Sequence, residues 1–287
     1  MTQPATVRDL PPYRAVVVVD MKDYSRHPGA EQQQLTETIP VVLERAFGQA
    51  GRPEIWAARR FPDSTGDGYA VGFAPEVLPF LVGPFLDSLQ RELEYRDQVL
   101  RSVSRSARMR MRVAITVGPL AEAEGDGDGT GDSRVEAHRL VDADEVRRLL
   151  DESDPDVTFV AAILSDRVHR DVIAAGYAPK PATEYVRTSV SVKSYRGEAF
   201  LHVPKPSDRL LEKGFGQQQV ERAEEAAAAV GEPKHYNTHN EFSGTASGMV
   251  IQAGRVGNVH QTDNSVRQHV QGNNNTVSGR DIHGSGR

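Results

Sequence analysis

Apolar residues recur along this chain with two spacings, one typical of strands and the other of amphipathic helices. Residues 14–19 are a β-branched run that predicts a buried strand, and residues 31–50 carry apolar side chains at helical spacing until Gly51 and Pro53. Further strands are predicted over 55–60, 68–73, 109–117, 157–163, 186–192 and 199–203, and further helices over 76–103, 134–150 and 165–175. Interleaved in this order, they predict an α+β fold in which helices cover a mixed sheet.

The apolar pattern stops near residue 205, and the composition then changes twice. Residues 207–230 are polar and end in the run ERAEEAAAAV, which is typical of a solvated helix. From residue 241 onward there is no Leu, Lys, Pro, Tyr or Trp, and Gly, Asn, Ser, Val, His and Gln dominate. The predicted organisation is an N-terminal extension (1–12), a folded domain (13–205), a partly helical linker (206–239) and a Gly/Asn-rich tail (240–287).

Charge and residue content exclude several classes of protein. The 287 residues carry a formal net charge of −6 and include no cysteine. An acidic balance gives no support to general nucleic-acid binding, and without cysteine neither disulfides nor thiolate metal sites can form. The first residues lack the apolar core of a signal peptide, and no apolar stretch reaches membrane-spanning length. We therefore expect a soluble, cytoplasmic protein that binds neither nucleic acid nor a membrane.

Two aspartates stand where strands end. Asp20 follows the first buried strand in VVVVDMKDYS, and Asp67 lies between Gly66 and Gly68 in STGDGYAVGF. A hairpin beside a central strand would bring both carboxylates to one sheet edge, where they suit a magnesium ion that also binds substrate phosphates. The glycines allow a sharp turn and the close approach of a phosphate. Taken singly, each aspartate is better explained as a helix cap or a hairpin turn than as a metal ligand.

The order of these segments resembles the class III adenylate and guanylate cyclase domain. The resemblance spans about residues 13–204 and continues through MRMRVAITVGPL (109–120), GDSRVEAHRL (131–140) and VSVKSYRGEAFLHVP (190–204). It implies the mixed palm-type sheet of that family, related to the ferredoxin-like fold. Asp20 and Asp67 match the family's two metal aspartates, which hold two Mg²⁺ or Mn²⁺ ions, and Arg139 matches its transition-state arginine.

Activity and partners follow from the same resemblance. The family converts a nucleoside triphosphate into a cyclic mononucleotide and pyrophosphate, and its arginine comes from the partner subunit, which implies a homodimer. The alternative interpretation, which does not use the resemblance, is that Arg139 is a surface helix residue that forms an ion pair with Glu136 or Asp142.

The chain departs from the family pattern at the base-recognising and transition-state positions. Asp63 stands where the family has a base-recognising lysine, and Val135 replaces the transition-state asparagine. Asp128 falls at the second base-recognising position, within the acidic loop GDGDGTGD. The nucleotide base is therefore left open. The alternative to an enzyme is a catalytically inactive cyclase-like protein that senses nucleotides or serves as a scaffold and acts through its tail.

The tail contains a second resemblance. NEFSGTASGMVIQAGRVGNVH (240–260) resembles the short bacterial amyloid-signalling motifs at the termini of actinobacterial defence proteins. Such low-charge, β-rich segments without proline can stack in register with copies of themselves. The resemblance implies a homotypic partner that binds through 240–260, and with it a role in defence signalling. The other interpretation is a disordered Gly/Asn-rich tail.

Overall fold

The computed structural model describes residues 9–103, 108–121, 129–213, 260–262 and 265–267. Its contacts divide the chain into two units, Met1–Val220 and Glu221–Arg287. Within the second unit, the described strands β8 (His260–Thr262) and β9 (Ser265–Arg267) form a short antiparallel pair. The remainder of the predicted self-association segment and of the linker lies outside the described residues. None of the helices in the described ranges is long and apolar enough to cross a membrane.

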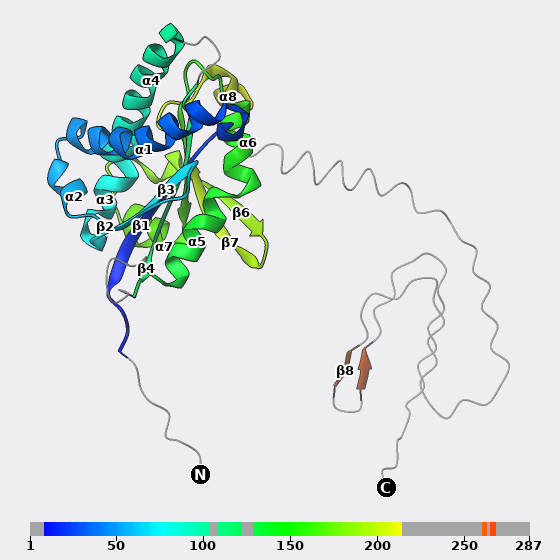
Figure 1. Cartoon of the computed structure of the whole chain (residues 1–287). Coiled ribbons are helices and arrows are strands. Elements are labelled where there is room, and N and C mark those ends of the chain that lie inside the picture. The colour runs from blue at the N-terminus through cyan, green and yellow to red at the C-terminus, as the bar shows by residue number, and fades with distance from the viewer. Residues whose placement is uncertain (1–8, 104–107, 122–128, 214–259, 263–264, 268–287) are drawn as a thin grey trace, which may run out of the picture. The chain divides into compact units, whose positions relative to one another are not determined.

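A seven-stranded mixed sheet forms the centre of the first unit, with the strand order β2-β3-β1-β4-β5-β7-β6 (Figure 1). The β4–β5 pair is parallel and the other pairs are antiparallel. The strands are β1 (Tyr13–Met21), β2 (Arg60–Ser64), β3 (Gly68–Phe73), β4 (Met111–Pro119), β5 (Val160–Ser165), β6 (Val186–Val192) and β7 (Tyr195–His202). A parallel pair needs a crossover connection, which here contains two helices.

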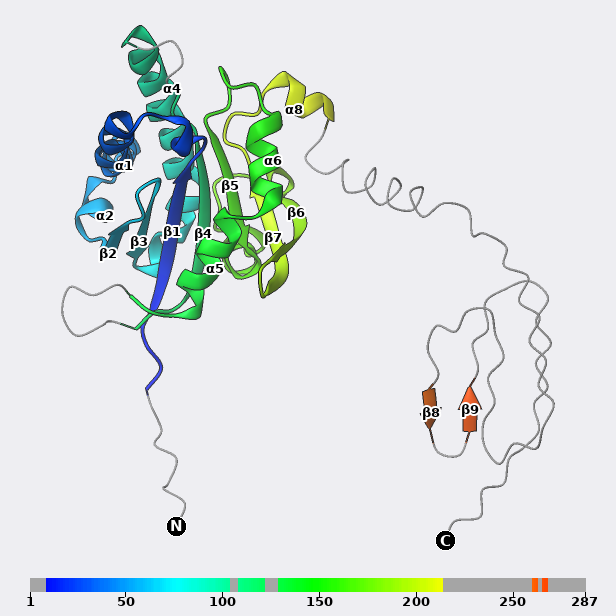
Figure 2. The same cartoon turned by 45° about the vertical axis from the view of Figure 1, so that its right-hand side comes forward.

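Helices cover both faces of the sheet, as Figure 2 shows. On one face lie α1 (Gly29–Gln49), α2 (Pro53–Ala57), α3 (Leu78–Phe80) and α4 (Leu86–Val103), the last two joined by the π-helical segment Leu81–Phe85. On the other face lie α5 (Asp132–Val141) and α6 (Asp144–Glu152). Shorter segments are α7 (Asp166–Val168), which a π-helical turn over His169–Ala174 extends, and α8 (Asp208–Lys213). The α+β fold with a helix-covered mixed sheet is confirmed.

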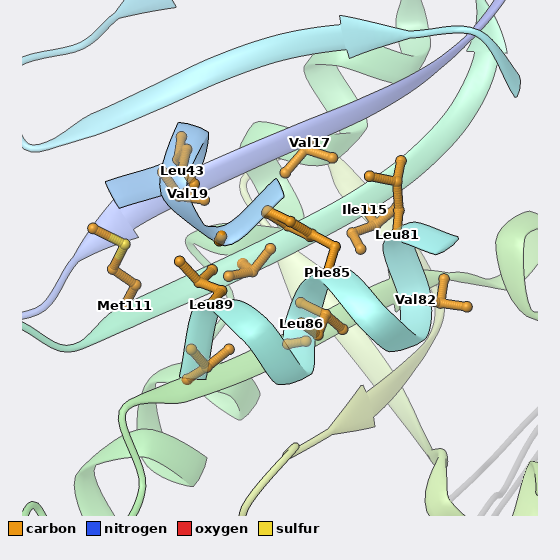
Figure 3. Packing of buried hydrophobic residues seen from close by; sticks show 14 of the residues in the cluster. Val17, Val19, Leu43, Leu81, Val82, Phe85, Leu86, Leu89, Met111 and Ile115 are labelled. Atoms are coloured by element: carbon orange, nitrogen blue, oxygen red, sulfur yellow. The ribbon is translucent and has the colours of Figure 1, made fainter. Parts of the chain in front are cut away.

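Strand β1 separates two hydrophobic cores because successive side chains of a strand point to opposite faces. Val17 and Val19 pack with residues of α1, of the π-helical segment Leu81–Phe85 and of α4, as Figure 3 shows for Leu43, Phe85 and Leu89. Val16 and Val18 instead pack against α5 and α6. Asp20 continues the even-numbered series, so its side chain belongs to the face that α5 and α6 cover.

The predicted strand over 55–60 is wrong, because this segment forms helix α2. Pro53 stands at the first helical position, where its fixed φ suits a helix and its missing N–H costs nothing. Ile55 and Trp56 are buried, and the Trp56 ring lies 5.6 Å from the ring of Phe47. The strand β2 begins instead at Arg60, the last residue of the predicted strand. Asp63 is therefore a strand residue.

The single helix predicted over 134–150 is also wrong, because it divides into α5 and α6. Ala143 adopts an extended conformation (φ −63°, ψ 140°) and is fully buried, so the chain changes direction there. Apolar residues on both sides of the break continue at helical spacing, so the pattern does not reveal it. Ser165 caps α7 by accepting a hydrogen bond from the N–H of Val168 (3.3 Å), and β6 and β7 form an antiparallel hairpin.

A buried histidine predicts a loss of stability in acid. His202 is 1% exposed, and its Nε2 has no hydrogen-bond partner among the described residues. Burial lowers the pKa of His202 below its ordinary 6.5, although the hydrogen bond with the Glu184 carbonyl opposes this. The unfolded chain therefore binds a proton at His202 more tightly than the folded protein does. The stability that the neutral histidine contributes is complete above about pH 6.5, and it is lost as the pH falls through the pKa of the folded state.

We therefore expect the unfolding temperature to fall between pH 7.5 and pH 5, and to fall less in a His202→Gln variant. Circular dichroism melts at several pH values measure both slopes. His138 and His169, whose pKa values burial also lowers, leave a residual slope in the variant. Equal slopes in the two proteins would contradict the assignment to His202.

Candidate functional site

Asp20 lies at the end of β1, between two neighbouring strands. In the antiparallel registers it is opposite Gly68 of β3 on one side and Arg112 of β4 on the other. Directly opposite residues of neighbouring strands share a face of the sheet. The Arg112 guanidinium therefore reaches the Asp20 carboxylate, and its Nη2 donates a hydrogen bond to Oδ1. The other carboxylate oxygen has no hydrogen bond with a described residue.

Asp67 is held beside Asp20 by the geometry of the β2–β3 turn. The backbone carbonyl of Asp67 accepts a hydrogen bond from the N–H of Met21 (2.8 Å). Gly66 has a φ of +91°, which L side chains rarely adopt. A Cβ at Gly68 would lie 2.4 Å from the carbonyl oxygen of Val19, so only glycine allows the hairpin to approach β1 this closely. Sequence reasoning predicts this meeting of two distant segments, and the structure brings the two aspartates together.

Electrostatics at this edge favour the binding of a cation. Burial raises the pKa of Asp20, and the Arg112 hydrogen bond and charge oppose that rise. The negative charges of Asp67 and Asp142 raise the pKa of Asp20 further, which places both within electrostatic reach of it. A divalent cation would relieve the repulsion between the carboxylates.

The donor set fits magnesium in a substrate site better than a closed structural metal site. Within the described ranges, no group of three or more His, Asp or Glu side chains is arranged to hold a metal. Mg²⁺ is usually bound by one or two carboxylates, with waters and substrate phosphates completing its coordination. Asp20 and Asp67 supply two such carboxylates. The Asp20 carboxylate would bind the metal ion and the Arg112 guanidinium at the same time.

Asp63 and Asp128 are the two positions expected to recognise the nucleotide base, and the structure describes only the first of them. Asp63 in β2 accepts a hydrogen bond from the Arg134 guanidinium of α5 at 2.5 Å, so its charge is already paired. Asp128 lies outside the described residues. On the same side of α5, His138 has a pKa that burial lowers and that the Arg134 charge lowers further.

Arg139 lines a pocket of about 440 Å³ between α5, the end of β4 and the turn before β7. Its walls include Val117, Ser133, Glu136, Arg167, Ser194 and Tyr195, but neither Asp20 nor Asp67. The pocket is at the end of β4 remote from Arg112, because Val117, Gly118 and Pro119 line it. The structure therefore does not bring Arg139 to the aspartates of its own chain.

The interpretation of Arg139 as a surface ion-pair residue is wrong. Glu136 accepts a hydrogen bond from the Tyr195 hydroxyl (2.9 Å), and Asp142 accepts one from Arg147 (2.7 Å). No salt bridge joins Arg139 to another residue in the described part of the chain. Val135, at the family's asparagine position, is 54% exposed.

Sequence reasoning missed Arg112, Arg134 and Tyr195 as parts of these sites. Arg112 lies in the alternating run MRMRVAITV, which shows that it shares a face with Ala114. Its pairing with Asp20 depends on strand register, however, which periodicity does not determine. The contacts of Arg134 and Tyr195 join elements far apart in the chain and have no local signal.

Comparison with known proteins gives matches among solved structures alone, since no family model and no curated protein match the chain. An adenylate/guanylate cyclase/hydrolase from Silicibacter pomeroyi is similar, with 19% identity, 67% of this chain and 97% of that chain covered, and a TM-score of 0.46. The adenylyl cyclase CyaB from P. aeruginosa is 13% identical, with 69% and 96% covered and a TM-score of 0.45.

Proposed function

We propose that residues 13–205 form a metal-dependent nucleotidyl cyclase domain, which converts a nucleoside triphosphate into a cyclic mononucleotide and pyrophosphate. The observation that carries the proposal is the placement of Asp20 near the end of β1 beside Asp67 in the β2–β3 turn, in the two segments where the sequence resembles the cyclase family. Two neighbouring carboxylates at the end of a strand suit a site that takes a metal together with a polyphosphate.

In the proposed reaction the ribose 3′-hydroxyl oxygen attacks the α-phosphorus of the same nucleotide. The bond from the α-phosphorus to the oxygen that bridges to the β-phosphate breaks, pyrophosphate leaves, and the hydroxyl proton passes to solvent. Two Mg²⁺ or Mn²⁺ ions bound by Asp20 and Asp67 would make the hydroxyl more acidic and neutralise the triphosphate. Arg112 keeps the Asp20 carboxylate oriented at the end of β1.

Arg139 stabilises the charge that develops on the α-phosphate, as positioned cations do in phosphoryl transfer. Its pocket is remote from the aspartates of the same chain, which supports a site shared between two chains of a homodimer. The absence of an ion pair at Arg139 within the described ranges supports a role toward an anionic substrate.

The choice of base remains open in this proposal. Asp63 is paired with Arg134, and a lysine that could read a purine is absent from this position. A pyrimidine nucleotide is therefore as acceptable as a purine one. Val135 and Asp63 are also the observations that favour the second candidate, an inactive cyclase-like domain that senses nucleotides or serves as a scaffold.

The experiment that separates the two candidates uses the full chain. The protein is incubated with each of the four nucleoside triphosphates and Mg²⁺ or Mn²⁺, and cyclic products are identified by mass spectrometry. We expect a cyclic product with at least one nucleotide, which Asp67→Ala does not make. No product above that control with any nucleotide would remove the enzyme and leave the inactive alternative.

We further propose that 240–287 is a self-association tail, which 206–239 links to the cyclase domain. The support lies in the sequence, since Gly, Asn, Gln and Val within 240–260 suit stacked strands. A synthetic peptide of residues 240–260 is expected to form assemblies that increase thioflavin fluorescence over hours. A scrambled peptide of the same composition is the control. A peptide that stays soluble and unstructured, like the control, would contradict the proposal.

A further inference from the structure

Tyr195 and Glu136 join two elements inside the Arg139 pocket. Tyr195 is the first residue of β7, and its hydroxyl donates a hydrogen bond to Oε1 of Glu136 on α5 (2.9 Å). The tyrosine ring lies close over the following strand, because a Cβ at Gly197 would be 2.7 Å from the hydroxyl oxygen. The hydroxyl is therefore held at a defined place beside α5.

Glu136 would otherwise be the natural partner of Arg139. The two residues are three positions apart on one helix, a spacing at which opposite charges commonly pair. In the structure the carboxyl group is bonded to Tyr195 instead, and no salt bridge with Arg139 forms. The other nearby acid, Asp142, is paired with Arg147 at 2.7 Å. Arg139 is left without an ionic partner within the described residues although acids flank it.

The surroundings of Glu136 also shift its pKa. Burial raises the pKa of Glu136, the Tyr195 hydrogen bond opposes the rise, and the charges of Asp166 and Arg167 act in opposite directions. Asp132, one turn earlier on α5, also lines the pocket. The two guanidinium groups of Arg139 and Arg167 in one pocket suit a phosphate chain, since arginine binds phosphate oxygens by charge-assisted hydrogen bonds.

We propose that Tyr195 is a positioning residue, whose hydroxyl holds the Glu136 carboxyl away from Arg139 and so leaves the Arg139 guanidinium available to a phosphate group. This inference rests on the proposed cyclase function, because it gives Arg139 an anionic ligand. A different role would be mechanical, with the hydrogen bond serving only to attach α5 to β7. The two roles make opposite predictions for a double variant.

The experiment measures the affinity of the full chain for pyrophosphate by titration calorimetry without divalent cations, so that the proposed metal site at Asp20 and Asp67 does not bind the pyrophosphate. Tyr195→Phe releases Glu136, which can then pair with Arg139, so we expect affinity to fall about fivefold, the upper end for a partly exposed ion pair. Tyr195→Phe/Glu136→Gln removes the competing charge without restoring the attachment, so we expect affinity to return to within about twofold of the wild type. Arg139→Ala identifies the pocket by abolishing binding.

A matched control is Tyr185→Phe, which also removes a hydroxyl hydrogen bond, here one to the Val82 carbonyl (3.1 Å). It should leave pyrophosphate affinity at the wild-type value. Thermal melts check that each variant is folded. If Tyr195→Phe does not fold, Glu136→Gln alone tests the inference: it should bind pyrophosphate at least as tightly as the wild type, and weaker binding would contradict it.

The outcomes separate this inference from the proposed function. If the double variant stays as weak as Tyr195→Phe, the role is mechanical and the inference is wrong. If Tyr195→Phe binds like the wild type while Arg139→Ala does not bind, the inference is wrong and the role of Arg139 stands. If all the pyrophosphate results are as expected but no nucleotide is cyclised, the inference stands and the cyclase proposal is wrong.

Discussion

Replacing Asp67 with alanine is expected to lower cyclic nucleotide formation on the order of 10³-fold, because the variant loses one of the two carboxylates proposed to bind the catalytic cations. Asp20→Ala should have an effect of similar size. In Asp20→Ala an added penalty arises because Arg112 loses the acid that neutralises it. Initial rates with the preferred nucleotide and Mn²⁺ measure both effects.

Asp208→Ala is a suitable control, because Asp208 is an exposed aspartate at the start of α8. It should keep the wild-type rate. Thermal melts of the three variants show whether a lost rate reflects lost folding. Activity of folded Asp67→Ala close to that of the wild type would contradict the assignment of Asp67.

Arg139→Ala is expected to lower kcat about 10²- to 10³-fold, because the developing charge on the α-phosphate loses its cation. The effect should appear mainly in kcat, since the proposed metal site at Asp20 and Asp67 would still bind the triphosphate. Arg209→Ala changes an exposed arginine on α8 and should have no such effect. Steady-state kinetics of the folded variants measure the difference, and an unchanged kcat would remove Arg139 from the mechanism.

A mixture of two inactive variants tests whether Arg139 acts across the dimer. In a heterodimer of Asp67→Ala with Arg139→Ala, one of the two sites combines an intact aspartate pair with an intact arginine. After random exchange of chains, about a quarter of the wild-type activity should return. No recovery, with exchange shown by differently tagged chains, would place all the functional groups in one chain.

Much of the fold could be predicted from local patterns. The β-branched run before Asp20 is buried on both faces of the sheet, and the hydrophobic period of 31–50 corresponds to α1. The meeting of Asp20 and Asp67 was also predictable, because a hairpin with Gly66 and Gly68 next to a central strand leaves few other arrangements.

The incorrect predictions concern segments whose structure depends on tertiary contacts. The short apolar run over 55–60 suits a strand as well as a helix, and the sequence alone favoured the strand. In the folded protein the packing of Trp56 on Phe47 stabilises the helix. The break at Ala143 has no sequence signal of its own, since alanine favours helices. At Arg139, the local spacing correctly predicts that Glu136 and Asp142 lie near. It does not reveal that Tyr195 and Arg147 have already bound them.

The most direct measurement is a Mn²⁺ titration of the wild type, Asp20→Asn and Asp67→Asn, in which electron paramagnetic resonance counts the ions that remain free. These substitutions keep the side-chain size and remove one charge each. We expect the wild type to bind Mn²⁺ saturably and each single variant to bind it at least about tenfold more weakly, since each substitution removes a ligand of the same metal cluster. Binding that is the same in all three folded proteins would contradict it.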